Sequence, residues 1–228
     1  MDILSPAFLS ALLAIIVIDL ALAGDNAIVI ALAARGLPAR ERRLAILWGT
    51  AGAVIVRCLM TLAVVWLLGI PGLMAAGGAI LVWIAVKLLR PPEDAPGHEV
   101  KAAVGFWGAM QTIVVADAAM GLDNVLAVAG AAHGSFLLVV IGLAISIPIV
   151  IWGSTLILKW VERFPWIVHV GVAVLAWTAA KMIVGEPLFK PFFDAHLEAA
   201  LAVYAAVIGG VYATGFYVQR RRAATAGA

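Results

Sequence analysis

The sequence predicts an all-α protein, a polytopic transmembrane helical bundle. Its 228 residues are 65% hydrophobic and 12% charged, whereas an ordinary soluble domain is roughly 45–50% apolar and about 25% charged. The mean hydropathy is +1.11. Apolar runs of about 20 residues, the length that crosses the hydrocarbon core as a helix, recur along the chain. The alternation of apolar and polar residues that is typical of transmembrane β-barrel strands is missing.

Seven apolar runs, bounded by glycine, proline or charged residues, are the predicted spans: 7–34, 43–68, 71–90, 103–132, 135–160, 165–185 and 196–218. The first span ends before Gly36, and a cluster of arginines precedes the second. Pro71 opens the third span and Pro165 opens the sixth. The hydrophilic stretch "PPEDAPGHEV" separates the third span from the fourth.

The order of the spans predicts four units along the chain. Residues 1–90 form a first three-helix unit, and residues 91–102 form a cytoplasmic linker. Residues 103–185 form a second three-helix unit, and residues 186–228 hold the seventh helix with a basic C-terminal tail.

The basic residues predict that the N-terminus lies outside and the C-terminus inside, because cytoplasmic loops hold the excess of Lys and Arg. In this orientation twelve basic residues are cytoplasmic: Arg35, Arg40, Arg42, Arg43, Lys87, Arg90, Lys101, Lys159, Arg163, Arg220, Arg221 and Arg222. Only Lys181 and Lys190 fall on the other side, and Arg57 lies near the middle of the second span. Orientation in the lipid bilayer and contact with anionic lipid headgroups account for the basic loops, so no nucleic-acid partner is expected.

Two segments repeat the same polar residues inside apolar surroundings. "DLALAGDNAIVIALAARG" begins at Asp19, and "DAAMGLDNVLAVAGAAHG" begins at Asp117. Farther along, Pro71, Gly77, Trp83 and Lys87 match Pro165, Gly171, Trp177 and Lys181. Because each copy holds three spans, an odd number, the second must enter the membrane from the opposite face. We therefore predict an inverted repeat of the kind from which secondary transporters are built.

Four aspartates inside predicted spans need a physical explanation. Each ionisable residue near the bilayer centre costs about 2.5–3.5 kcal/mol, so the four together cost on the order of 10 kcal/mol if unpaired. On a regular helix Asp19 and Asn26 share a face, but Asp25 lies far round the cylinder. Gly24 and Gly121 could break the helices near these residues.

Folding the two copies together predicts a site near the midplane that offers only oxygen ligands. Carboxylate and amide oxygens suit hard divalent cations such as Mg²⁺, Ca²⁺ or Mn²⁺. The candidate metal ligands are Asp19, Asp25, Asn26, Asp117, Asp123 and Asn124. The alternative is that these residues only cap helices or form hydrogen bonds between them.

Arg57 is predicted to be the charge partner of the acidic cluster, because a midspan arginine cannot readily reach the interface. It has no basic counterpart in the second copy. When the cation leaves, carboxylates crowded in a dry site would take up protons, so cation–proton exchange is the expected coupling. No enzymatic activity and no cofactor are expected; the cation is the substrate.

Other functions stay open at this point. The site could serve Ca²⁺/H⁺ exchange or export of a cationic amino acid. A different class is an intramembrane aspartyl protease, which needs one pair of carboxylates that share a proton. Two matched sets of acids, each with an asparagine, are not required for that chemistry. A purely structural subunit leaves the carboxylates unexplained.

The doubled "DLALAGDN" and "GLDN" motifs, each inside a membrane helix, resemble those of the TerC family of bacterial integral membrane proteins, in its shorter, YjbE-type branch. The resemblance covers nearly all of residues 7–218. It implies the LysE-like transporter superfamily, the bacterial cytoplasmic (inner) membrane, and manganese export or delivery of manganese to exported metalloenzymes. A homo-oligomer is a further expectation.

Overall fold

The structure is a computed structural model that describes residues 5–67, 70–89, 98–132 and 135–226. Within these ranges the chain is entirely helical, without strands, which confirms the all-α class. The nine helices of the described part are α1 (Pro6–Ala34), α2 (Ala39–Leu62), α3 (Val64–Leu67), α4 (Leu73–Leu89), α5 (His98–Ala131), α6 (Phe136–Arg163), α7 (Ile167–Val184), α8 (Lys190–Ala195) and α9 (Leu197–Ala226).

Each predicted span falls on a helix of this set, namely α1, α2, α4, α5, α6, α7 and α9. Among the described residues, four helices are long and apolar enough to cross a membrane, α2, α6, α7 and residues 197–217 of α9, and α1 makes a fifth if its two arms count as one span. The described helices thus include several that are apolar enough for membrane spans, while seven spans and their orientation stay predictions. Residues 91–97 of the predicted linker lie outside the described residues, and 98–102 belong to α5.

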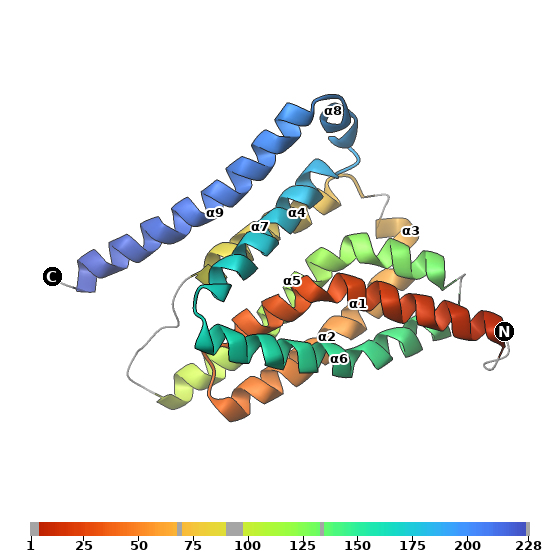
Figure 1. Cartoon of the computed structure of the whole chain (residues 1–228), viewed down its shortest axis with the longest axis horizontal. Coiled ribbons are helices and arrows are strands. Elements are labelled where there is room, and N and C mark those ends of the chain that lie inside the picture. Colours follow the sequence, from red (N-terminus) through yellow and green to blue (C-terminus); the bar gives the residue numbers. More distant parts are fainter. Residues whose placement is uncertain (1–4, 68–69, 90–97, 133–134, 227–228) are drawn as a thin grey trace.

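The helices pack in three main pairs. Helix α1 packs along α6, α2 packs along α5, and α4 packs along α7. Helices α1 and α5 also contact each other. Figure 1 shows α9 at the edge of the molecule, where it lies against α7 and α4 and is joined to α7 through α8. The pairing places α1, α2, α5 and α6 around a common interior, and the candidate site lies there.

Helix α1 changes direction in its middle. Its N-terminus is fixed by Ser5, whose hydroxyl accepts a hydrogen bond of 3.2 Å from the N–H of Phe8, the geometry of an N-cap. The axes of its two arms, Phe8–Leu20 and Gly24–Ala34, differ by 49°. The bend lies near Gly24, where a break was predicted, but α1 is helical throughout from Pro6 to Ala34. Helix α5 is also helical without interruption from His98 to Ala131, so the break predicted near Gly121 is wrong.

Glu186, which follows α7, closes the N-terminus of α4. Its side chain is buried, and its carboxylate accepts hydrogen bonds from the N–H groups of Gly72 (2.8 Å), Met74 (3.0 Å) and Ala75 (3.2 Å). The first N–H groups of a helix have no partner within the helix, so this carboxylate replaces a local cap. Gly72 has φ +83°, a backbone conformation that favours glycine.

Substitution of Glu186 by glutamine is expected to lower the free energy of unfolding at neutral pH by about 1 kcal/mol, the usual effect of a lost cap. Burial raises the pKa of Glu186, but the backbone N–H donors of residues 72, 74, 75 and 188 hold that pKa below its ordinary 4.5. The stabilisation is therefore fully present above pH 4.5 and is lost as the pH falls through the folded pKa. Thermal unfolding in detergent should show the Tm values of wild type and Glu186→Gln converging in acid. A gap that is constant across pH would contradict this role.

Candidate functional site

A small cavity lies between α1, α2, α5 and α6. Its walls combine apolar side chains, such as Ile30, Val54 and Val150, with a set of polar ones. The polar lining residues are Asp19, Asn26, Thr50, Arg57, Asp117 and Ser146. Such a concentration of polar groups inside an apolar bundle is costly unless they are paired or functional.

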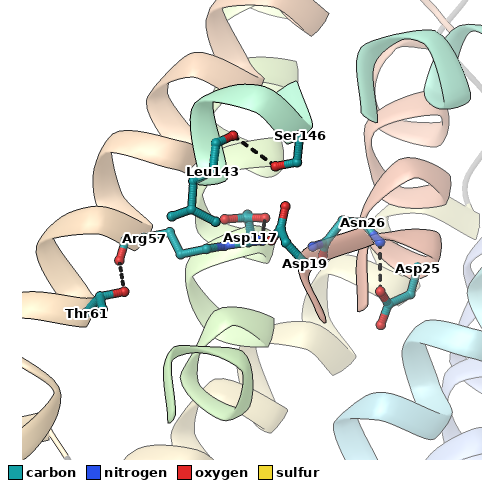
Figure 2. A network of polar contacts seen from close by, with 8 residues as sticks. All are labelled: Asp19, Asp25, Asn26, Arg57, Thr61, Asp117, Leu143 and Ser146. Carbon is teal, nitrogen blue, oxygen red and sulfur yellow. Dashed lines mark hydrogen bonds and ion pairs between the residues drawn. The ribbon is translucent and has the colours of Figure 1, made fainter. Parts of the chain in front are cut away.

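Arg57 joins the two aspartates of the cavity. From α2, its Nη1 donates to the carboxylate of Asp19 on α1, and its Nη2 donates to the carboxylate of Asp117 on α5. Figure 2 shows the guanidinium extending toward both carboxylates, with Ser146 of α6 nearby. The side chains of Arg57 and Asp19 are 5% and 4% exposed, and that of Asp117 is 12% exposed. One buried cation therefore offsets part of the charge of two buried anions.

This arrangement follows from the sequence in two steps. Asp19 and Asp117 occupy matched positions of the two similar segments, and the contact between α1 and α5 brings those segments together. Arginine carries a planar fork of donors, so it can bind two separate carboxylates at once, which a lysine ammonium does less well. The packing of α2 along α5 then places Arg57 between them.

Three buried oxygens in this region have no hydrogen-bond partner among the described residues. They are Oδ1 of Asn26, Oγ1 of Thr50 and Oδ2 of Asp117, and all three residues line the cavity. A buried acceptor left without a partner costs about 1–3 kcal/mol. Together they offer one carboxylate oxygen, one amide oxygen and one hydroxyl oxygen, which are the kinds of ligand atom that hard cations bind.

The hydroxyl of Ser146 faces the same cavity from α6. It donates a hydrogen bond of 2.9 Å to the carbonyl of Leu143, so its oxygen lone pairs stay available to a bound cation. Thr50 was not predicted from the sequence, because a single threonine in an apolar helix is indistinguishable from a packing residue. Only its position on the cavity wall identifies it.

Asp25, the second predicted aspartate of α1, is not part of the cavity lining. Its Oδ1 accepts a hydrogen bond of 2.9 Å from the N–H of the next residue, Asn26. Figure 2 shows its carboxylate on the far side of Asn26 from the Arg57 ion pairs. Asn124 is buried, at 7% exposure, but is not a lining residue either. The side chain of Asp123 lies outside the described part of the structure.

Of the five predicted ligands whose side chains the structure describes, Asp19, Asn26 and Asp117 line the cavity, whereas Asp25 and Asn124 do not. Across the described ranges, no group of three or more His, Cys, Asp or Glu side chains could hold a metal ion. What the cavity does contain is two carboxylates bridged by Arg57, together with neutral oxygens. The metal-ligand assignments stay predictions.

Known proteins resemble the chain along most of its length. The family model described as "Integral membrane protein TerC family" matches residues 4–223. The membrane protein YjbE of Bacillus subtilis (strain 168) is 47% identical over 189 residues, which cover 83% of this chain and 86% of YjbE. The inner membrane protein YgdQ of Escherichia coli (strain K12) is 23% identical over 204 residues, covering 82% of this chain and 83% of YgdQ. No solved structure matches the chain.

Proposed function

Because the chain belongs to the TerC family of integral membrane proteins, we propose that it is a transporter that exports a divalent metal cation, Mn²⁺, across the bacterial cytoplasmic membrane in exchange for protons. The observation that carries the proposal is the cavity between α1, α2, α5 and α6. It combines two buried aspartates from matched segments with unpartnered buried oxygens.

The donor atoms favour a hard divalent cation. Asp19 and Asp117 supply carboxylates, and Asn26, Thr50 and Ser146 supply neutral oxygens. Cysteine and histidine, the ligands that Zn²⁺ and Cu⁺ prefer, are not among the lining residues. The oxygen set suits Mn²⁺, Ca²⁺ and Mg²⁺ alike; the choice of Mn²⁺ rests on the resemblance of the sequence to TerC proteins.

The packing of the helices supports a transporter built from an inverted repeat. The first two helices of each predicted unit exchange partners, so that α1 lies along α6 while α2 lies along α5. The third helices, α4 and α7, pack on each other. A two-fold relation between the units accounts for all three pairs, and in transporters with such repeats the substrate site lies at the interface between them.

Arg57 argues against the protease alternative. An aspartyl protease dyad holds one proton between two adjacent carboxylates, which lowers their mutual repulsion. Here the guanidinium of Arg57 bridges Asp19 and Asp117 and neutralises one of their charges. The arrangement therefore fits the binding of a cation better than proton-shared hydrolysis.

The proposal is tested by the metal content of bacterial cells grown in excess manganese. Cells that produce the protein are expected to hold at least about tenfold less manganese than cells that lack it, with iron, calcium and magnesium measured in the same samples. A selective fall in calcium would favour the Ca²⁺ alternative. Unchanged content of every divalent metal would contradict the export of these cations.

A second readout addresses the coupling. Inside-out vesicles that contain the protein should release protons from their lumen as Mn²⁺ enters, recorded with a pH-sensitive dye. Manganese entry without any proton movement would contradict the exchange and leave the transport of the cation intact.

A further inference from the structure

The guanidinium of Arg57 lies between the two carboxylates of the cavity, where the proposed function would have the transported cation bind. Both carboxylates of the cavity, on Asp19 and Asp117, accept hydrogen bonds from it. Arg57 itself is 4% exposed, so it competes for them inside the protein and not from solvent. A divalent ion that binds between the same two aspartates must take these oxygens from the guanidinium.

We propose that Arg57 is a tethered counter-ion that binds Asp19 and Asp117 when the site holds no cation, and that the transported cation binds by displacing it. This inference rests on the proposed function and adds the step that sets the affinity of the site. Arg57 is a positioning and competing group in this scheme, not a ligand.

The unpartnered oxygens give the incoming cation a first set of ligands. Arg57 leaves Asn26 Oδ1, Thr50 Oγ1 and Asp117 Oδ2 free of hydrogen bonds from the described residues. A partly dehydrated cation can bind these oxygens before either ion pair is broken. Repulsion between the cation and the guanidinium then favours movement of Arg57 away from the carboxylates.

Arg57 can bind the two carboxylates again after the cation has left. Its Nε lacks a hydrogen-bond partner in the described part of the chain, so only its two terminal nitrogens need to exchange partners. When the cation leaves, the guanidinium again compensates the carboxylates, which avoids the high cost of two bare buried anions. A transporter must bind its ion weakly enough to release it, and an internal competitor weakens binding without removing a ligand.

The experiment measures Mn²⁺ binding to purified protein in detergent by calorimetry and by the Mn²⁺-dependent rise of Tm. Arg57→Gln removes the competing charge and is expected to bind Mn²⁺ at least about tenfold more tightly than wild type, the scale of one strong charge interaction at a buried site. Export by this variant should be slower, because the cation is retained.

Two further variants keep the test decisive. Arg57→Lys retains the charge for folding, but its single ammonium binds two carboxylates less well, so a smaller increase in affinity is expected. The matched control is Arg42→Gln, which breaks an interhelical ion pair with Glu162 (2.6 Å) away from the cavity and should leave the Mn²⁺ affinity at the wild-type value.

The outcomes separate this inference from the proposed function. Wild-type binding together with unchanged or weaker binding by Arg57→Gln and Arg57→Lys would overturn the competitor role and leave the cation site standing. Failure of the wild type and every Arg57 variant to bind Mn²⁺, Ca²⁺ or Mg²⁺ would overturn both.

Discussion

Replacement of Asp117 by asparagine is expected to reduce cation export at least about tenfold. The change removes one of the two carboxylates of the cavity. One of its oxygens becomes an amide nitrogen, which does not bind a cation, and the other becomes a weaker, uncharged amide oxygen. The loss of one charge–charge contact at a buried site costs several kcal/mol at most, and a tenfold reduction in export corresponds to about 1.4 kcal/mol. Asparagine has nearly the same shape, so Arg57 keeps a hydrogen-bond acceptor and the fold should be retained. Export is measured as the loss of manganese from preloaded cells.

The matched control is Asp194→Asn. Asp194 lies on α8, where its exposed carboxylate pairs with Lys190 at 2.6 Å, and exposed pairs of this kind contribute little. Export by this variant should equal that of wild type. Asp19→Asn should behave as Asp117→Asn does, because the two residues share Arg57. Normal export by both cavity variants would contradict the site.

Replacement of Gly78 by alanine is expected to destabilise the contact between α4 and α7. A Cβ atom at Gly78 would lie 2.7 Å from the carbonyl oxygen of Ala179 and 2.9 Å from Cγ1 of Ile183. Backbone oxygen cannot move aside as a flexible side chain can, so the helices must separate. Small residues permit this close approach in membrane proteins, and overpacking typically costs about 1–3 kcal/mol. The measurement is the Tm of purified protein in detergent.

Gly209→Ala is the control for this change. Gly209 lies in α9, and a Cβ atom there would meet nothing within 4 Å. Alanine also has the higher helix propensity, so the Tm should stay the same or rise slightly. Equal losses of Tm for the two variants would mean that the α4–α7 contact is not as close as described.

The positions of the helices were predictable because apolar length is a strong signal. Every predicted span coincides with a helix of the described structure, with ends that differ by a few residues. The exceptions have local causes. The second predicted span, 43–68, is divided at Ala63 into α2 and α3, and α9 continues as far as Ala226, beyond the predicted end at 218. The division at Ala63 is not marked by a proline or glycine in the sequence, and Gly215 lies inside α9 without ending it.

The site was predictable only where a charge stood out. Asp19, Asp117 and Arg57 are conspicuous in apolar helices, and the matched spacing indicated that the two aspartates meet. The spacing could not show that Asp25 turns to the backbone of Asn26, because that choice depends on local geometry. Neutral residues such as Thr50 carry no signal until the cavity is known.

Glu186 illustrates a second limit of the sequence. Nothing in the sequence indicates that a glutamate after the sixth predicted span would accept hydrogen bonds from the N–H groups of Gly72, Met74 and Ala75, more than a hundred residues earlier. Caps supplied by a distant segment leave no local pattern, since the usual cap residue lies next to the helix that it closes.

The most direct test of the account is the flux of Mn²⁺ into proteoliposomes that contain only the purified protein and a dye quenched by manganese. The account predicts saturable quenching with wild type and none above empty liposomes with the double variant Asp19→Asn/Asp117→Asn. Equal quenching by the two proteins would contradict it, as would wild-type vesicles that admit no more manganese than empty ones.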